Sequence, residues 1–192
     1  RLMPEIANGT ANNQRIGTEI KITKFNVRGV ITMTYPQATA NNARFGIRLT
    51  VLRAKDVNDW QQAQTNFGTG YIKLLEGQTL GNQGTLLDFN TPINFDAFTV
   101  VKDMRIKMTQ GLTGGAGTSQ SDAYSSTAMF NFDMPAACKR LVYDEQYDVN
   151  DPNNFPYFML VNYTKLDGSA ADAAGTTYLT MQYVTTCRYD DA

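Results

Sequence analysis

Residues 24–35 alternate between apolar and polar side chains, and this pattern constrains the fold more than any other feature of the sequence. The apolar set, with one glycine, occupies the odd positions: Phe25, Val27, Gly29, Ile31, Met33 and Tyr35. A period of two residues over this length predicts a β-strand with one buried face, and it places Lys24, Asn26 and Arg28 on the other face. Ile20 and Ile22 fall on the opposite parity, which predicts a β-bulge near residues 22–24.

Similar runs recur along the chain, separated by clusters of Gly, Pro, Asn and Asp that favour turns. We expect further strands at residues 43–52, 98–108, 128–134, 139–144, 157–164, 177–183 and 184–190. In the first of these, Phe45, Ile47, Leu49 and Val51 are expected to point inward, and Arg44, Arg48 and Thr50 outward. In the second, Phe98, Val100, Met104, Ile106 and Met108 share one face, which Lys102 interrupts.

About eight strands with long, unequal connections favour an all-β fold in which two antiparallel sheets pack as a jelly roll, because a meander needs only short turns. At 192 residues the chain fits one domain. We expect an extended N-terminal arm over residues 1–15 and a single jelly-roll domain over residues 16–192. The long polar connections at residues 56–94 and 111–127 predict binding or subunit-contact loops. No stretch approaches the ~20 apolar residues that span a bilayer.

The sequence contains no histidine. This removes the commonest general base, the Ser-His-Asp and Cys-His arrangements and most zinc sites, so we expect no enzyme, no metal and no cofactor. The acidic group Asp144, Glu145, Asp148 and Asp151 fits a solvated turn better than a glycosidase carboxylate pair or a calcium site. Cys138 and Cys187 are either two buried thiols or one disulfide, and the sequence leaves this open.

Basic residues gather in the first third of the chain. Residues 1–55 contain nine Lys or Arg against two Glu, whereas the remaining residues contain eight Lys or Arg against sixteen acids. The candidate phosphate-binding side chains are Arg15, Lys21, Lys24, Arg28, Arg44, Arg48, Arg105 and Lys107. If their strands share a sheet, they form a basic patch that binds nucleic acid without reading its bases. The alternative is that they are solvent-facing side chains that protect sheet edges.

Several segments, in order along the chain, resemble the capsid proteins of circovirus-like viruses, which carry circular single-stranded DNA and encode a rolling-circle replication protein. The resemblance begins with the lead Arg15-Ile16-Gly17 into the first strand, which continues as Val27-Arg28-Gly29-Val30-Ile31. Further matching segments are 44–55 with Asp56 and Asn58, Asn94-Phe95-Asp96-Ala97-Phe98-Thr99-Val100-Val101-Lys102-Asp103, 139–143 and 187–191.

The resemblance implies a structural capsid subunit, a jelly roll of which about 60 identical copies form a small icosahedral T=1 shell around circular single-stranded DNA. The virion is its implied location, with assembly inside the host cell and the nucleus as one candidate compartment. The implied partners are other copies of the chain, the genome and a host receptor that the sequence does not identify, without membrane insertion.

One departure from that family concerns the N-terminal arm. Such capsid proteins carry an Arg-rich arm, whereas only Arg1 and Arg15 precede the first strand of this sequence. Genome binding therefore falls either to an arm upstream of Arg1 or to the sheet face that lies on the inside of the shell.

Two other functions stay open at this point. Capsids of satellite-type RNA viruses share the architecture, so DNA and RNA are both candidate genomes. A lectin-like β-sandwich would instead use Trp60, Tyr71 and nearby loop aromatics to stack on sugar rings.

Overall fold

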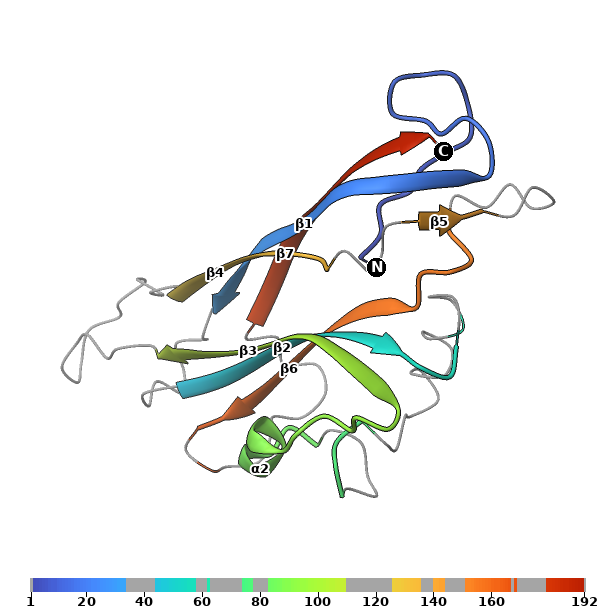
Figure 1. Ribbon diagram of the computed structural model, residues 1–192. Coiled ribbons are helices and arrows are strands. Elements are labelled where there is room, and N and C mark those ends of the chain that lie inside the picture. The colour runs from blue at the N-terminus through green and yellow to red at the C-terminus, as the bar shows by residue number, and fades with distance from the viewer. Residues whose placement is uncertain are drawn as a thin grey trace.

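The computed structural model describes residues 2–33, 44–57, 62, 74–77, 83–109, 126–135, 140–143, 151–166, 168 and 179–191. Within these ranges the chain forms two antiparallel β-sheets and one short helix. The sheets lie as two layers of a sandwich (Figure 1). The predicted all-β class and the two packed antiparallel sheets are therefore confirmed.

The first sheet is built around β1 (Glu19–Met33). β7 (Leu179–Asp191) pairs with β1 from Ile20 to Met33, which covers almost the whole strand. β4 (Ser126–Asp133) and β5 (Arg140–Val142) pair with β1 in turn, so they follow one another along its opposite edge. Every pairing in this sheet is antiparallel.

The second sheet places β2 (Arg44–Ala54) between β3 (Phe98–Thr109) and β6 (Tyr157–Lys165), again with antiparallel pairing throughout. The chain crosses between the sheets from β1 to β2, from β3 to β4, from β5 to β6 and from β6 to β7. The packing of the two central strands, β1 and β2, therefore connects distant parts of the sequence.

The main core lies between the sheets, where the alternating apolar residues of the central strands meet. The side chains of Ile20, Val27, Ile47, Leu49 and Val51 are all 0% exposed. Removing apolar surface from water contributes roughly 25 cal/mol per Å², so these strands supply the largest stabilising term of the fold. The inward positions predicted for both strands are confirmed, apart from Tyr35, which lies outside the described residues.

A second apolar cluster covers the outer face of the second sheet. It joins Leu52 and Phe98 to Leu74, Leu75 and Ile93, and an isolated β-bridge pairs Leu75 with Ile93. The helix α2 (Leu86–Asn90) lies over the same face, on the side turned away from the first sheet (Figure 1). The predicted long connection at 56–94 therefore contains ordered elements that pack on the sheet.

This cover buries β2 on both faces. Arg48 and Thr50 lie on the outward face of β2, as predicted, but at 1% and 0% exposure neither side chain reaches solvent. Alternation gives the parity of a side chain correctly, but it does not report what packs on the outer face.

The predicted bulge in β1 is confirmed, because the register with β7 shifts between Ile22 and Lys24. A second bulge lies in β3, where Val51 pairs with Lys102 but Leu52 pairs with Val100. The extra residue, Val101, reverses the parity of β3. Its apolar residues consequently divide between two clusters instead of sharing the single face that was predicted, with Phe98 and Val100 outside and Met104, Ile106 and Met108 in the main core.

The strand count differs from the prediction at the C-terminal end. Residues 179–191 form the single strand β7, so the two strands predicted at 177–183 and 184–190 are one. The described ranges accordingly contain seven strands rather than eight. β7 stays paired with β1 without interruption across residues 183 and 184.

The segment before β1 is anchored to the sandwich. Leu2, Met3 and Ile6 are 2%, 2% and 3% exposed and belong to the main core. The chain then loops back on itself, with an isolated bridge between Asn8 and Arg15. The arm predicted over residues 1–15 is thus packed against the core at residues 2–6.

Gly29 permits a close approach at the centre of the first sheet. A Cβ atom there would lie 2.5 Å from the Gln182 carbonyl oxygen and 2.5 Å from Cζ of Phe130. The missing side chain therefore makes room for the Phe130 ring in the core. No helix among the described residues is long and apolar enough to cross a bilayer.

Candidate nucleic-acid interface

The predicted basic residues occupy two opposite surfaces of the sandwich. A single patch requires their strands to share a sheet, but β1 belongs to the first sheet and β2 and β3 to the second. Lys21, Lys24 and Arg28 lie on the outer face of the first sheet, and Arg44, Arg48, Arg105 and Lys107 lie on the outer face of the second. The condition for one patch is not met, because the core separates the two sets.

The outer face of the first sheet carries exposed cations that no described element covers (Figure 1). We call this surface, formed by the outward side chains of β4, β1 and β7, the bare face. Lys21, Lys24 and Arg28 are exposed on β1, and the exposed Arg188 of β7 lies directly opposite Lys24. Arg188 was not among the predicted residues.

The spacing of these cations follows from strand geometry. Lys24 and Arg28 are four residues apart on one strand, which at ~3.4 Å per residue separates them by roughly 13 Å. Arg188 sits one strand away from Lys24, at a Cα separation of about 4.5–5.5 Å. Within the described ranges none of the three has an ion-pair partner. They are therefore available to an external anion.

Three acids lie on this surface or at its margin: Asp133, Glu19 and the exposed Asp190 of β7, which is directly opposite Lys21. Asn26 Nδ2 donates to Asp133 Oδ1 at 2.9 Å and to Asn131 Oδ1 at 2.8 Å. Glu19 forms an ion pair with Arg140 of β5. Arg140 therefore balances the charge of Glu19, whereas neutral Asn26 leaves Asp133 its charge. The cations Lys21, Lys24, Arg28 and Arg188 still outnumber Asp133 and Asp190 on this face, so its local field stays positive.

Apolar side chains interrupt the polar surface near its centre. Met129 is 86% exposed and lies opposite Val30, and Val184 is 58% exposed and lies opposite Arg28. The described part of the bare face contains no aromatic side chain. Such a surface can contact phosphates and apolar edges of a nucleic acid, but it lacks the rings that stack on bases.

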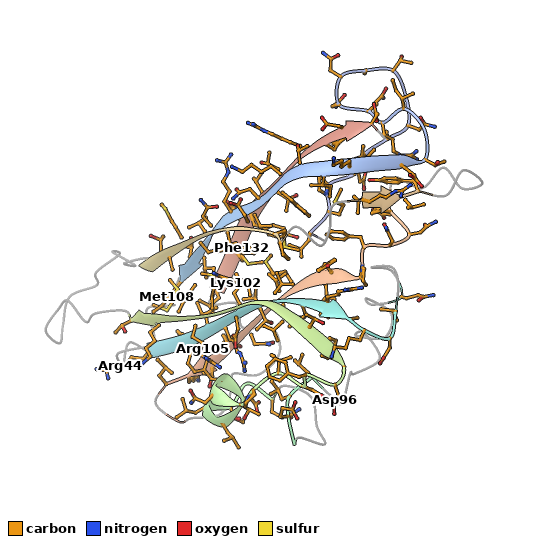
Figure 2. All side chains as sticks on the ribbon, in the orientation of Figure 1. Arg44, Asp96, Lys102, Arg105, Met108 and Phe132 are labelled. Atoms are coloured by element: carbon orange, nitrogen blue, oxygen red, sulfur yellow. The ribbon has the colours of Figure 1, made fainter. Side chains whose placement is uncertain are left out.

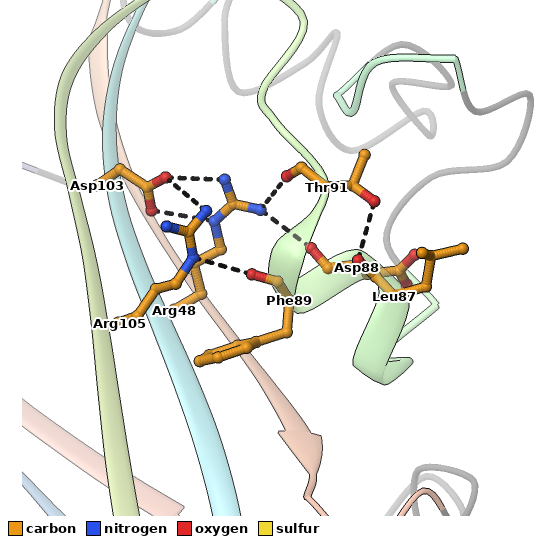
Figure 3. A network of polar contacts seen from close by, with 7 residues as sticks. All are labelled: Arg48, Leu87, Asp88, Phe89, Thr91, Asp103 and Arg105. Carbon is orange, nitrogen blue, oxygen red and sulfur yellow. Dashed lines mark hydrogen bonds and ion pairs between the residues drawn. The ribbon is translucent and has the colours of Figure 1, made fainter.

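Arg48 serves a different purpose, at the centre of a buried polar network (Figure 3). Its guanidinium binds Asp103 through two hydrogen bonds, Nε to Oδ1 at 3.0 Å and Nη2 to Oδ2 at 2.8 Å. Its Nη1 donates to the carbonyl oxygens of Asp88 at 3.0 Å and Thr91 at 2.5 Å. At 1% exposure Arg48 cannot reach a phosphate without dismantling these contacts.

Arg105 supports the same network from β3. Its Nε donates to the Phe89 carbonyl oxygen at 3.0 Å, and its Nη2 lies 3.3 Å from Asp103 Oδ2. The carbonyls that Arg48 and Arg105 bind lie at the C-terminal end of α2 and just beyond it, where a helix leaves acceptors unpaired and favours positive charge. The two arginines therefore fasten α2 to the sheet.

The start of α2 is fixed by a capping box. The Thr85 hydroxyl accepts from Asp88 N at 3.1 Å, and Asp88 Oδ2 accepts from Thr85 N at 3.2 Å. This pattern of Thr followed three residues later by Asp was visible in the sequence but was not used to predict a helix. A small hollow beside α2 is lined by Arg48 and Asp88 of this network and by Asn162 of β6, among others.

Arg15 is also committed to packing. It is 4% exposed, its Cζ lies 4.2 Å from the centroid of the Tyr143 ring, and Nη1 donates to the Gly17 carbonyl. Arg44 and Lys107, in contrast, are exposed at one end of the second sheet, where Arg44 opens β2 and Lys107 lies opposite Gly46. Figure 2 shows Arg44 and Arg105 on the side of the molecule away from the first sheet.

The other predicted sites lie mostly outside the described residues. This holds for Asp144, Glu145 and Asp148 of the acidic group, for Cys138, and for Trp60 and Tyr71. Among the residues that the structure does describe, no group of three or more His, Cys, Asp or Glu is arranged to hold a metal. The carbohydrate-binding alternative and the Cys138–Cys187 pairing therefore remain predictions.

Comparison with known proteins does not place the chain in a family. No protein-family model matches the sequence, and no curated protein matches it. The likeness to circovirus-like capsid proteins consequently depends on the short motifs quoted above.

Proposed function

We propose that this chain is a capsid subunit that assembles with identical copies into a small icosahedral shell around a single-stranded nucleic acid. The bare face carries the proposal: three exposed cations, Lys24, Arg28 and Arg188, lie on neighbouring strands without an ion-pair partner in the described ranges. On the opposite sheet, α2 and the second apolar cluster cover much of the outer face. Exposed Lys and Arg on a flat surface contact phosphates without reading sequence, as packaging of a whole genome requires.

The strand order also supports a jelly-roll subunit. β1 pairs with β7 and β2 with β6, so the pairs nest from the two ends of the chain inward. The nesting ends with these two pairs, because β3 pairs with β2 and both β4 and β5 pair with β1. A T=1 shell of about 60 copies is the assembly proposed for such a subunit, with circular single-stranded DNA as the cargo that the resemblance favours.

The test combines particle imaging with nucleic-acid binding. Purified protein is mixed with circular single-stranded DNA or with RNA of equal length, then examined by negative-stain microscopy and by a salt titration of affinity. We expect uniform particles, and the cargo that yields them at lower protein concentration identifies the genome type. A protein that stays monomeric at every salt concentration with both cargoes would contradict the proposal.

One triple variant and one double control variant identify the binding face. Changing Lys24, Arg28 and Arg188 to Ala removes three phosphate contacts, and each contributes ~0.7 to the slope of log K against log salt for single strands. We therefore expect the slope to fall by about 2. The matched control changes the exposed Arg44 and Lys107 of the opposite sheet to Ala and should leave the slope nearly unchanged. Equal effects of both variants would reject the bare face as the binding surface.

A further inference from the structure

The β6 and β7 side of the sandwich is less closed than the opposite side. The inward side chains Met159 and Tyr163 of β6 and Met181 and Tyr183 of β7 pack on the main core but are only partly buried. Val161, between the first two, is 37% exposed. Inward side chains at the centre of β1 and β2 are 0% exposed, whereas those of β6 and β7 are partly exposed. The core is therefore less well covered on the β6 and β7 side.

The opposite side is closed and its edge is protected. β3 and β4 lie against each other there, and Phe130, Phe132 and Met108 are buried between the sheets. β3 also carries a bulge and an exposed lysine, Lys102, on the face that points toward the first sheet (Figure 2). A bulge and an inward-pointing charge are two devices that prevent an edge strand from pairing with another chain.

β6 has none of these devices. From Tyr157 to Thr164 it contains no charged residue, no proline and no glycine, and its register with β2 shows no shift. In the described ranges β6 pairs only with β2, so residues 159–164 present a regular edge of backbone donors and acceptors. Such an edge is a template for another strand.

The sequence of β6 fits a second copy of itself. In an antiparallel pair centred on Val161, Met159 of one copy lies opposite Tyr163 of the other, and Val161 lies opposite Val161. These are the inward residues of the strand, so the contact would continue the main core across the junction with Met–aromatic and Val–Val pairs. No like charges meet, whereas β3 carries four charged residues along its length and β7 carries three at its C-terminal end.

We propose that the β6 edge is a homotypic contact, in which the second sheet continues into a second copy of the chain across a two-fold axis at Val161. This inference rests on the proposed self-assembly and names one of the surfaces that produces it. A two-fold contact requires the same patch on both copies to be self-complementary, and the β6 edge meets this requirement in shape, polarity and charge.

The first experiment places at the β6 edge the residue type that protects β3. Val161→Lys puts two lysines opposite one another at the axis, and we expect dimer formation and particle yield to fall by at least about tenfold. Ile16→Lys is the matched control, since it adds the same charge at a branched apolar side chain that is 64% exposed and lies outside both β6 and the bare face. Dimer and particle populations are measured by analytical ultracentrifugation and microscopy, with far-UV circular dichroism to verify folding.

The second experiment does not depend on disrupting the contact. Residues opposed across an antiparallel pair have Cα atoms about 4.5–5.5 Å apart, which lies within the range of a disulfide. Val161→Cys should therefore give a covalent dimer on mild oxidation, whereas Val184→Cys and the unaltered protein should give little. If Val161→Lys does not fold, the comparison of Val161→Cys with Val184→Cys still tests the β6 contact.

The outcomes separate the two proposals. Unaltered protein that never associates contradicts self-assembly itself. Unaltered protein that assembles while Val161→Lys assembles equally well, and Val161→Cys gives no more covalent dimer than Val184→Cys, overturns only the β6 contact.

Discussion

Arg48→Met and Asp103→Asn each remove one partner of the Arg48–Asp103 ion pair. We expect the two substitutions to lower the free energy of unfolding by different amounts. The Arg48 side chain is 1% exposed, whereas the Asp103 side chain is 23% exposed. In Asp103→Asn the guanidinium keeps its charge in a site that water does not reach. Removing one partner of a buried pair in this way costs about 3–5 kcal/mol of unfolding free energy.

Arg48→Met leaves a charge that is easier to accommodate. The Asp103 carboxylate remains partly solvated, and Arg105 still lies 3.3 Å from it. The main loss is the donor to the carbonyls of Asp88 and Thr91, and an unsatisfied buried acceptor costs about 1–3 kcal/mol. Methionine retains most of the apolar stem of the arginine. We expect a cost of about 2–3 kcal/mol, below that of Asp103→Asn.

The double variant completes the cycle. It removes both charges at once, so its cost should be no greater than that of Asp103→Asn alone. The coupling between the two sites should then be at least about 2 kcal/mol, the cost of Arg48→Met. Urea denaturation followed by far-UV circular dichroism, with linear extrapolation, measures all four proteins. The reasoning fails if Arg48→Met costs more than Asp103→Asn, or if the two single costs simply add.

Two further predictions concern the first sheet. Gly29→Ala places a Cβ 2.5 Å from both the Gln182 carbonyl oxygen and the Phe130 ring. The free energy of unfolding in urea should therefore fall by about 1–3 kcal/mol. A change within error would show that the sheet adjusts to the added methyl group. Burial, with Asp191 and Cys187 as lesser causes, raises the pKa of the Tyr189 hydroxyl above its ordinary 10.0. The unfolded chain therefore loses this proton first, so stability is full below about pH 10 and falls above it, and Tyr189→Phe should flatten the fall in thermal denaturation above that pH.

Local patterns predicted the faces of β1 correctly because strand periodicity is a property of neighbouring residues. The bulge at residues 22–24 could be predicted for the same reason, since Ile22 and Phe25 must both reach the core. The bulge in β3 was missed, because Val100 and Val101 are adjacent apolar residues and either one satisfies the alternation.

Contacts between distant residues account for the other misses. Arg48 was expected in solvent, but its partners Asp88, Thr91 and Asp103 lie 40, 43 and 55 residues away in the sequence. Arg188 became part of the candidate site only through the pairing of β7 with β1, which sets it opposite Lys24. Alternation gives a side chain its face, but it says nothing about which strand or helix comes to lie beside it.

The two outer faces of the sandwich differ, because α2 covers one and no described element covers the other. This difference has a consequence for a second sheet that continues through β6 into another copy. Opposed residues of antiparallel strands point to the same side, so the two-fold axis at Val161 stands perpendicular to the sheet. Both copies then turn their bare faces in one direction and their α2-covered faces in the other. One side of the dimer therefore carries the exposed cations of both copies, and the other side carries both α2 helices. The orientation of these two faces in a closed shell is set when the first dimer forms.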